Sequence, residues 1–351
     1  MPSMTRAVLI ERLGPPEVFV ERAVSLPDIG PDDVHLRIEA CGVNFADLMM
    51  RVGLYGTVPP RPFSPGFEVA GTVIQVGGEV ESFRPGDRAV GLLRYGGYAN
   101  DTVVPAGQLF PCPDSLSPVE AAAIPVIFMT SWVCLFEAAQ ARKGETVLIL
   151  GASGGVGTAA VQLAVNAGLR VIGTAGTEQK RSFVTDELGA EACFDSRGEW
   201  PPDILNLVGE RGIDIALDPV GGSATKACRD LLGPLGRLVF YGMSQALPGR
   251  RRRWLSAARA WLKTERFHPA HLAEPNIGIW GVHLLHLGRK EREVLMPVAA
   301  EIFRQVQAGD IRPIIDSVFP LNREGAVGAH TRLHERANIG KVVLALEPNN
   351  T

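Results

Sequence analysis

A glycine-rich turn between two apolar segments constrains the fold of this chain more than any other stretch. It lies within Val147-Leu-Ile-Leu-Gly-Ala-Ser-Gly-Gly-Val-Gly-Thr-Ala-Ala-Val-Gln-Leu-Ala164. The apolar run before the turn is short, as in a buried strand, whereas the apolar residues after it recur at helical spacing, at Val156, Ala160, Leu163 and Ala167. Strand, turn and helix in this order predict a dinucleotide-binding βαβ unit.

The turn also matches the glycine fingerprint of such units, with Ala152 in the first glycine position. Gly154 would let a pyrophosphate approach the backbone, and Gly157 would let the helix pack closely on the strand. The helix N-terminus offers free N–H groups and a partial positive charge to a phosphate. We therefore predict dinucleotide contacts from the whole turn, at Ala152, Ser153, Gly154, Gly155, Val156 and Gly157. A glycine turn that only reverses the chain is the alternative.

Length, charge and cysteine usage restrict the class of protein. The 351 residues predict two domains. The net charge of −3 gives no reason to expect a nucleic acid partner. Near the N-terminus only four apolar residues follow one another, Ala7 to Ile10, too few for a signal-peptide core or a membrane span, so we expect a cytoplasmic location. The five cysteines are scattered without a Cys-x-x-Cys pair, so we expect reduced thiols.

The expected pattern of helices and strands changes near residue 125. Before it, β-branched runs between Gly- and Pro-rich turns predict a largely antiparallel, barrel-like domain with strands at 6–10, 33–40, 68–76, 87–92 and 97–104. After it, helices alternate with strands in the rhythm of a parallel doubly wound sheet. The expected helices are 131–141, 157–167 and 178–188, and the expected strands are 147–150, 170–174, 192–195, 213–218, 237–241 and 277–284. A helix at 290–308 and a tail ending in 340–346 close the chain.

Further motifs are Ala40-Cys-Gly-Val-Asn-Phe-Ala-Asp-Leu-Met-Met-Arg-Val-Gly-Leu-Tyr55, the stretches 64–77 and 84–90, and Asn338-Ile-Gly-Lys-Val-Val. Together with the glycine turn they resemble the medium-chain dehydrogenase/reductase superfamily. Within it the chain is most similar to the zinc-free quinone oxidoreductases, and Asp218-Pro-Val-Gly-Gly-Ser suggests the sub-branch of the synaptic-vesicle membrane protein homologues. The resemblance implies an α/β protein with a GroES-like catalytic domain (1–125 and 289–351), a Rossmann NADP-binding domain (126–288) and a substrate cleft between them.

Zinc ligands are absent from the positions where the resemblance places them. Zinc-dependent members carry a Cys where this chain has Asn44 and a His where it has Phe67, and neither side chain present offers a thiolate or an imidazole. The four closely spaced cysteines of the structural zinc lobe are missing too. We therefore expect no metal. Without a Lewis acid, reduction of an electron-poor quinone or α,β-unsaturated carbonyl is more probable than alcohol oxidation.

The end of the second Rossmann strand favours NADPH over NADH. Enzymes that use NAD place Asp or Glu about 20 residues past the fingerprint, and this chain has the uncharged segment with Thr174 and Gly176 there. The resemblance implies that Lys180 and Arg336 meet the 2′-phosphate. Ser196 replaces the family's tyrosine, and Arg197 beside it would compensate. A ribose contact from Glu178, or a merely solvated Lys180, are the alternatives.

The substrate side is assigned by resemblance alone. It gives catalytic roles to Asn44, Asp47 and Tyr55, and cofactor contacts to Thr130, Tyr241, Gly242, Met243, Gly281, Val282, His283 and Asn338. Asp47 as a helix cap or surface salt bridge, Tyr55 as a turn-packing residue, and His283 and His286 as packed or exposed histidines are the alternatives. No residue is identified as the proton donor, and water would protonate the reduced product.

The segment from Arg250 to Lys263 is a candidate basic amphipathic helix, with Trp254, Ala258, Trp261 and Leu262 on one face. A plain surface helix, a lid that attracts an anionic acyl thioester, and weak contact with an anionic membrane are three interpretations. The apolar strand at 277–284 either pairs with its copy in a homodimer, as the family implies, or is a buried terminal strand.

We therefore expect a cytoplasmic, zinc-independent, NADPH-dependent reductase of quinones or enones. Enoyl-thioester reduction in a biosynthetic pathway is the alternative within enzymes. An NADPH-binding membrane or lipid-handling adaptor with little turnover is the alternative from another class.

Overall fold

The computed structural model describes residues 3–346 apart from 57, 248–266 and 291. By their internal contacts, residues up to Val126 and from Ile315 onward form unit 1, and the described residues from Ile127 to Ile314 form unit 2. The first boundary lies next to the expected one. The second lies at 314/315, whereas we expected it at 288/289.

The displaced boundary follows from contacts of the segment after residue 289. Helices α10 (Leu284–Lys290) and α11 (Arg292–Ala308) pack against each other within unit 2. The loop after α11 is bonded to α4 (Gly155–Asn166), because Asn166 Nδ2 donates to the Asp310 carbonyl at 2.8 Å. Gln162 bonds both the N–H and the carbonyl of Arg312, at 2.9 and 3.0 Å. Side-chain amides thus bind this segment to the Rossmann unit.

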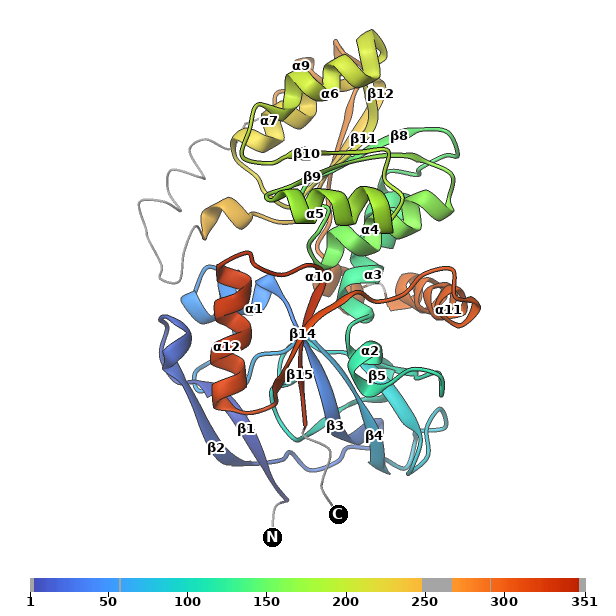
Figure 1. Ribbon diagram of the computed structural model, residues 1–351. Coiled ribbons are helices and arrows are strands. Elements are labelled where there is room, and N and C mark those ends of the chain that lie inside the picture. Colours follow the sequence, from blue (N-terminus) through green and yellow to red (C-terminus); the bar gives the residue numbers. More distant parts are fainter. Residues whose placement is uncertain (1–2, 57, 248–266, 291, 347–351) are drawn as a thin grey trace. The chain divides into compact units, whose positions relative to one another are not determined.

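Unit 1 is built on a seven-stranded sheet with the order β14-β15-β3-β4-β5-β7, in which β6 also pairs with β3 (Figure 1). All its pairings are antiparallel except β14 with β15. A separate antiparallel hairpin joins β1 to β2. The strands are β1 (Met4–Ile10), β2 (Phe19–Ser25), β3 (Asp33–Val43), β4 (Glu68–Val76), β5 (Arg88–Leu92), β6 (Asp101–Pro105), β7 (Leu109–Pro111), β14 (Ile315–Pro320) and β15 (Lys341–Ala345).

The last of the expected N-terminal strands begins later than its sequence pattern suggests, at Asp101 instead of residue 97. The reason is local, because the N–H groups of Gly97 and Tyr98 donate to the Gly66 and Pro65 carbonyls at 3.2 and 2.9 Å. These bonds hold residues 97–98 against a turn. The helices of unit 1 are α1 (Phe45–Val52), α2 (Pro118–Ala122) and α12 (Arg323–His334), with 3₁₀ turns at Pro16–Val18 and Ala106–Gln108.

Unit 2 contains a six-stranded, wholly parallel sheet with the order β10-β9-β8-β11-β12-β13. This is the Rossmann order 3-2-1-4-5-6, with the topological switch point between β8 and β11. The predicted doubly wound sheet is therefore confirmed. Its strands are β8 (Thr146–Ile149), β9 (Arg170–Ala175), β10 (Ala192–Asp195), β11 (Ile213–Asp218), β12 (Leu232–Phe240) and β13 (Gly278–Gly281).

Unit 2 also contains helices before, between and after these strands (Figure 1). They are α3 (Pro125–Trp132), continued by a π-helical turn at Val133–Ala138, α4, α5 (Glu178–Ser182), continued by another at Phe183–Glu187, α6 (Trp200–Val208), α7 (Ser223–Asp230), α9 (Ala270–Ala273), α10 and α11, with 3₁₀ turns at Gly209–Arg211 and Ser244–Ala246. The strand expected at 277–284 is shorter than predicted, because α10 already begins at Leu284.

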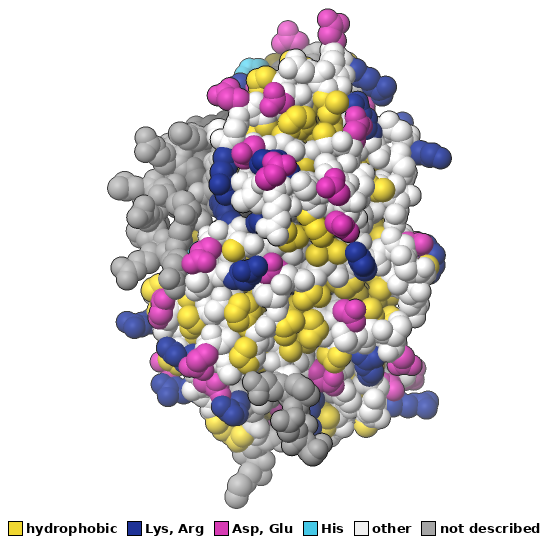
Figure 2. Space-filling model, in the orientation of Figure 1, with side chains coloured by type: hydrophobic (Ala, Val, Ile, Leu, Met, Phe, Trp, Pro, Cys, Tyr) yellow, Lys and Arg dark blue, Asp and Glu magenta, His cyan; other side chains and the backbone are white. Residues whose placement is uncertain are grey.

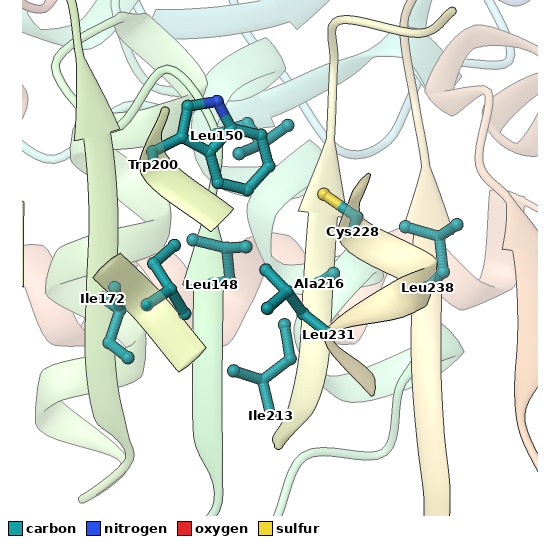
Figure 3. Packing of buried hydrophobic residues seen from close by; sticks show 10 residues of the cluster. Leu148, Leu150, Ile172, Trp200, Ile213, Ala216, Cys228, Leu231 and Leu238 are labelled. Carbon is teal, nitrogen blue, oxygen red and sulfur yellow. The ribbon is translucent and has the colours of Figure 1, made fainter. Parts of the chain in front are cut away.

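One face of the parallel sheet is covered by α6 and α7 through a close-packed apolar cluster (Figure 3). The four central strands contribute Leu148, Ile172, Ala216 and Leu238, and each is wholly buried. Trp200 and Ile204 come from α6, Cys228 comes from α7, and Leu231 directly follows α7. This packing fixes the carboxyl ends of the strands, where the predicted dinucleotide contacts lie.

Charged side chains of both signs are interspersed on the face that Figure 2 shows, with no broad field of one sign. Within the described ranges, no helix is long and apolar enough to cross a membrane.

Candidate functional site

The glycine turn connects β8 to α4 and leaves no room for a side chain at Gly157. A Cβ there would lie 2.2 Å from the Gly151 carbonyl oxygen and 2.7 Å from Cα of Ala152. At Gly154, which caps α4, a Cβ would meet the same oxygen at 3.3 Å. The first helical hydrogen bond runs from Thr158 N–H to Gly154 C=O at 2.8 Å. The three preceding N–H groups, from Gly155 to Gly157, are thus available to an anion.

Thr174 supports this turn from behind. Its carbonyl accepts the Ala152 N–H at 2.9 Å, and its hydroxyl accepts the Gly151 N–H at 3.3 Å. Thr174 is buried, at 1% exposure, so it holds the turn and offers no surface to a ribose. We predicted a direct cofactor contact for Thr174, and the structure gives it this supporting position.

Positive charge gathers where β9 and β10 end. Arg197 covers Gly176 so closely that a Cβ there would lie 3.3 Å from Nε and Nη2 of the guanidinium. Ser196 follows β10 and donates its N–H to the Ala175 carbonyl at 3.0 Å. Lys180 lies in the first turn of α5, where its N–H donates to the Thr177 hydroxyl at 3.4 Å. Gly176, Lys180, Ser196 and Arg197 are therefore attached to neighbouring strand ends.

Arg181 also belongs to this group, although the sequence patterns did not single it out. Its guanidinium bonds Glu178 and lies 3.3 Å from Asp195 Oδ2. Glu178, the alternative ribose acceptor, is thus paired with a cation on an exposed face. Arg181 thus pairs with the two carboxylates of this group, and the Arg197 guanidinium lies over Gly176. Two adjacent basic residues in the sequence, Lys180 and Arg181, are the signal that could have indicated this group.

The loops that follow β11 and β12 are held by hydrogen bonds to Asp218. Its Oδ1 accepts the N–H groups of Val220 and Gly221 at 2.7 and 3.0 Å, and its Oδ2 accepts the Thr225 hydroxyl at 2.6 Å. The Asp218 carbonyl accepts the Tyr241 N–H at 3.1 Å. Asp218 thereby shapes the loop after β11 and fixes the start of the segment at 241–243.

Other predicted cofactor residues of unit 2 lie on this edge. A Cβ on Gly242 would lie 2.9 Å from the Pro219 oxygen, and Met243 follows it. The Val282 N–H donates to the Phe240 carbonyl at 2.9 Å, which places Gly281, Val282 and His283 beside β12. His283 is exposed, with its ring centroid 4.4 Å from that of His286. Partial burial and the neighbouring His286 lower the pKa of His283.

Helix α3 reaches the first turn of α4, because the Ser131 hydroxyl donates to the Val156 carbonyl at 3.0 Å. Thr130, buried at 7% exposure, is its neighbour. Since parallel strands end at one edge and the switch point lies at β8 and β11, unit 2 has the geometry of a dinucleotide site.

In unit 1, Asp47 is committed to the backbone. Its Oδ2 accepts the Asn44 N–H at 2.8 Å and its Oδ1 accepts the Gly66 N–H at 2.9 Å. It is wholly buried, and burial raises its pKa to about 7. We predicted a catalytic role, but this geometry matches the helix-cap alternative.

Asn44, the N-cap residue of α1, lies in a buried polar cluster. Its Oδ1 accepts from Lys341 Nζ at 2.6 Å, and its Nδ2 donates to Glu68 Oε1 at 2.8 Å. Lys341 and Glu68 also form an ion pair at 2.5 Å. Sequence patterns did not single out either charged residue, although both stand inside motifs that carry the resemblance.

The Tyr55 ring packs beside Phe67, with centroids 5.7 Å apart and planes inclined by 49°. Burial and the Asp47 charge raise the pKa of Tyr55, so its hydroxyl is protonated at neutral pH. Phe67 is buried. Asn338 Nδ2 donates to the Gly340 carbonyl at 2.8 Å, and Arg336 is exposed, with a φ of 50°. These residues belong to unit 1 with Asn44 and Asp47, and the other predicted site residues belong to unit 2.

The remaining expectations concern the basic segment and a metal. The basic segment 250–263 lies outside the described residues. In the part of the chain that the structure describes, no three His, Cys, Asp or Glu side chains form a group that could hold a metal ion.

Comparisons with known proteins agree with both units. Residues 30–114 match the family described as alcohol dehydrogenase GroES-like domain, and residues 155–275 match the family described as zinc-binding dehydrogenase. The chain is 37% identical over 328 residues to a human synaptic vesicle membrane protein VAT-1 homolog, covering 93% of this chain and 82% of the relative. It is 33% identical over 344 residues to the quinone oxidoreductase of Sus scrofa, covering 97% of each.

Among solved structures, a mycobacterial protein in complex with NADPH superimposes with a TM-score of 0.85 at 28% identity, over 97% of this chain and 99% of that one. A GroES-like unit and a Rossmann unit with a dinucleotide-binding turn are what such reductases require. The chain is therefore an NAD(P)-dependent oxidoreductase that belongs to the quinone oxidoreductase family of the medium-chain dehydrogenase/reductase superfamily.

Proposed function

We propose that this enzyme is a zinc-independent reductase that uses NADPH to reduce a quinone or an α,β-unsaturated carbonyl. The observation that carries the cofactor choice is the Arg197 guanidinium over Gly176, where β9 and β10 end. Lys180 lies nearby in the first turn of α5, and Thr174 is neutral and buried. A 2′-phosphate would find cations there, whereas the ribose hydroxyl of NADH would lack a strand-end carboxylate. The NADPH of the mycobacterial relative supports the same choice.

The residues that would hold the cofactor fall into two groups. The N–H groups from Gly155 to Gly157 would receive the pyrophosphate at the N-terminus of α4. Lys180 and Arg197 would pair with the 2′-phosphate. Bound NADPH supplies a hydride from C4 of its nicotinamide. The acceptor takes that hydride with its two electrons, and one proton from water completes the reduced product.

Asn44 is assigned the contact to the acceptor's oxygen. An amide N–H there would stabilise the negative charge that develops on this oxygen as the hydride arrives. Zinc independence rests on residue chemistry, since Asn44 and Phe67 stand where zinc enzymes carry ligands. The ammonium of Lys341, 2.6 Å from Asn44 Oδ1, also opposes a second cation beside this side chain.

The test measures kcat/KM for NADPH and NADH with benzoquinone and with a simple enone. We expect at least about tenfold preference for NADPH, because a phosphate–guanidinium pair contributes on the order of 1.4 kcal/mol or more. Arg197→Ala should reduce that preference. Arg211→Ala removes an arginine that is 77% exposed in its side chain and 3.6 Å from Asp214, and it should leave the preference unchanged. A preference for NADH would refute the cofactor assignment.

The adaptor alternative is favoured by one observation, the name of the human relative as a synaptic vesicle membrane protein. Tight NADPH binding without turnover of quinones, enones or acyl thioesters would support it. Sedimentation with anionic vesicles would test membrane contact through 250–263, and a cytoplasmic location is the expectation if it fails. Turnover of acyl thioesters alone would favour the enoyl-thioester reductase.

A homodimer is proposed through β13, the edge strand of the parallel sheet. Its exposed edge can pair with a second copy, and Trp280 on it is half exposed. Light scattering that gives a monomer mass would refute this.

A further inference from the structure

We propose that Lys341 and Glu68 are positioning residues, which hold the side-chain amide of Asn44 in one orientation toward the electron acceptor. The proposal rests on the proposed function, because that function gives Asn44 its contact to the acceptor's oxygen. It adds to that function two residues outside the cofactor site and a structural reason for the direction in which the amide points.

Strand register brings the three side chains together. Strand β15 pairs with β3 in antiparallel register through Val342 and Val43, so the residues next to this pair, Lys341 and Asn44, come to lie opposite each other. Glu68 opens β4 on the other side of β3. Three strands far apart in the sequence thus place a cation, an amide and a carboxylate in one cluster.

The chemistry of the two ions fixes the amide orientation. A lysine ammonium only donates hydrogen bonds, and an ionised carboxylate only accepts them. The atom 2.6 Å from Lys341 Nζ is therefore the amide oxygen of Asn44, and the atom 2.8 Å from Glu68 Oε1 is its nitrogen. These hydrogen bonds join the amide to both ions. They leave its second N–H to donate to an acceptor.

The backbone around Glu68 is shaped to admit this arrangement. A Cβ on Gly42 would lie 2.5 Å from Glu68 Oε1 and 2.6 Å from the Ala122 carbonyl oxygen, so a side chain there would displace the carboxylate. The second oxygen, Oε2, accepts the Val126 N–H at 2.7 Å. The carboxylate is thus held from both sides before it meets Asn44.

Burial argues against a purely stabilising role for the ion pair. Glu68 is wholly buried and Lys341 is 2% exposed. Removing both ions from water offsets much of their attraction, so such pairs are poor devices for stability. Asn44 is also buried but keeps 8% of its surface exposed, more than either ion. The consequence of the pair is therefore geometric, because it prevents the amide from flipping and presenting its oxygen.

The test is a mutant cycle on kcat for NADPH-dependent reduction of benzoquinone. The double variant Lys341→Met with Glu68→Gln removes both charges without leaving an unpaired ion. We expect it to lower kcat about tenfold or more, because the donor is no longer oriented. The KM for NADPH should stay within about twofold, since Lys180 and Arg197, the proposed phosphate contacts, belong to unit 2. Asn44→Ala should lower kcat by a similar factor.

The decisive measurement is the triple variant. If the ions act through Asn44, adding the double substitution to Asn44→Ala changes kcat by less than about threefold. If the triple variant loses kcat by the product of the Asn44→Ala factor and the double-variant factor, the positioning role is refuted. If the double variant does not fold, Glu68→Gln alone enters the same cycle, with Lys341 still bonded to Asn44. Folding is checked by thermal unfolding of each variant.

Matched controls separate this proposal from the proposed function. Glu145→Gln breaks another ion pair, with Arg237 at 2.7 Å in unit 2, and should lower Tm without changing kcat. A wild-type enzyme that reduces no quinone or enone refutes the proposed function. A wild type that turns over, with an Asn44→Ala variant equal to it in kcat, refutes the positioning proposal alone.

Discussion

Gly154 and Gly157 stand three residues apart in the same turn, and the structure predicts opposite consequences for an alanine at each. At Gly157 an added Cβ would lie 2.2 Å from the Gly151 oxygen and 2.7 Å from Ala152 Cα, and both neighbours are backbone. Ordinary contact begins at 3.4 Å, so α4 would have to move away from β8 by about 1 Å. Overpacking of this kind costs about 3 kcal/mol, because no side chain can rotate away.

This free-energy cost should lower the melting temperature, Tm, by a measurable amount. For a domain of this size a loss of 1 kcal/mol lowers Tm by roughly 2–4 °C, so Gly157→Ala should lower the Tm of the apoenzyme by roughly 6–12 °C. At Gly154 the φ of −78° suits alanine, and the added Cβ meets the Gly151 oxygen at 3.3 Å. Gly154→Ala should therefore keep Tm within about 2 °C of wild type. Its Cβ would stand where the pyrophosphate approaches, so NADPH affinity should fall at least about tenfold.

Differential scanning fluorimetry of the apoenzymes and titration of NADPH fluorescence separate the two effects. A Gly157→Ala enzyme with the Tm of the wild type would show that helix and strand are not packed as described. A Gly154→Ala enzyme that binds NADPH like the wild type would refute the placement of the pyrophosphate at this turn.

Two further predictions concern stability. Burial raises the pKa of Asp47 from 3.8 to about 7, so the stability linked to its proton is complete below pH 3.8 and is lost as pH rises through 7. Asp47→Asn lacks this titration, and urea unfolding should show the wild type losing about 2 kcal/mol relative to it between pH 5.5 and 8.5; parallel pH profiles would contradict the burial argument. Trp200→Ala should cost unit 2 about 3–5 kcal/mol because Trp200 fills the cluster under α6, whereas Leu205→Ala, 48% exposed on the same helix, should cost less than about 1 kcal/mol. Equal midpoints for these two variants would argue against the described packing.

Sequence patterns predicted the parts of unit 2 that local periodicity controls. Strands β10 and β11 begin and end where their apolar runs do. Helix α6 was missed, because Trp200-Pro-Pro reads as a break, although proline is well tolerated in the first turn of a helix. Strand β13 was extended too far, because the apolar residues from Leu284 onward belong to a helix. A short apolar run does not itself distinguish the two.

The cluster around Asn44 was beyond such reasoning for a different reason. Its members are joined by the register of β3 with β4 and β15, and register depends on pairing between distant segments. A sequence shows that the motifs contain a glutamate and a lysine. It shows neither that they are buried nor that they contact the same amide. The same limit applies to Arg181, whose partner Asp195 follows on the next strand.

Asp47 and Asp218 show why an aspartate in a motif is weak evidence for catalysis. Both are wholly buried, and each carboxylate accepts N–H groups from two separate backbone positions, Asn44 and Gly66 for one, Val220 and Gly221 for the other. Aspartate suits this task because it is short and has two acceptor oxygens, and an asparagine would offer a donor where an acceptor is needed. Such a residue controls the shape of a loop that carries functional groups. Its replacement would lower activity through displacement of that loop, so a loss of activity alone cannot assign chemistry to it. Asn44, with its donor fixed by two ions and part of its surface exposed, is the better candidate to touch the acceptor.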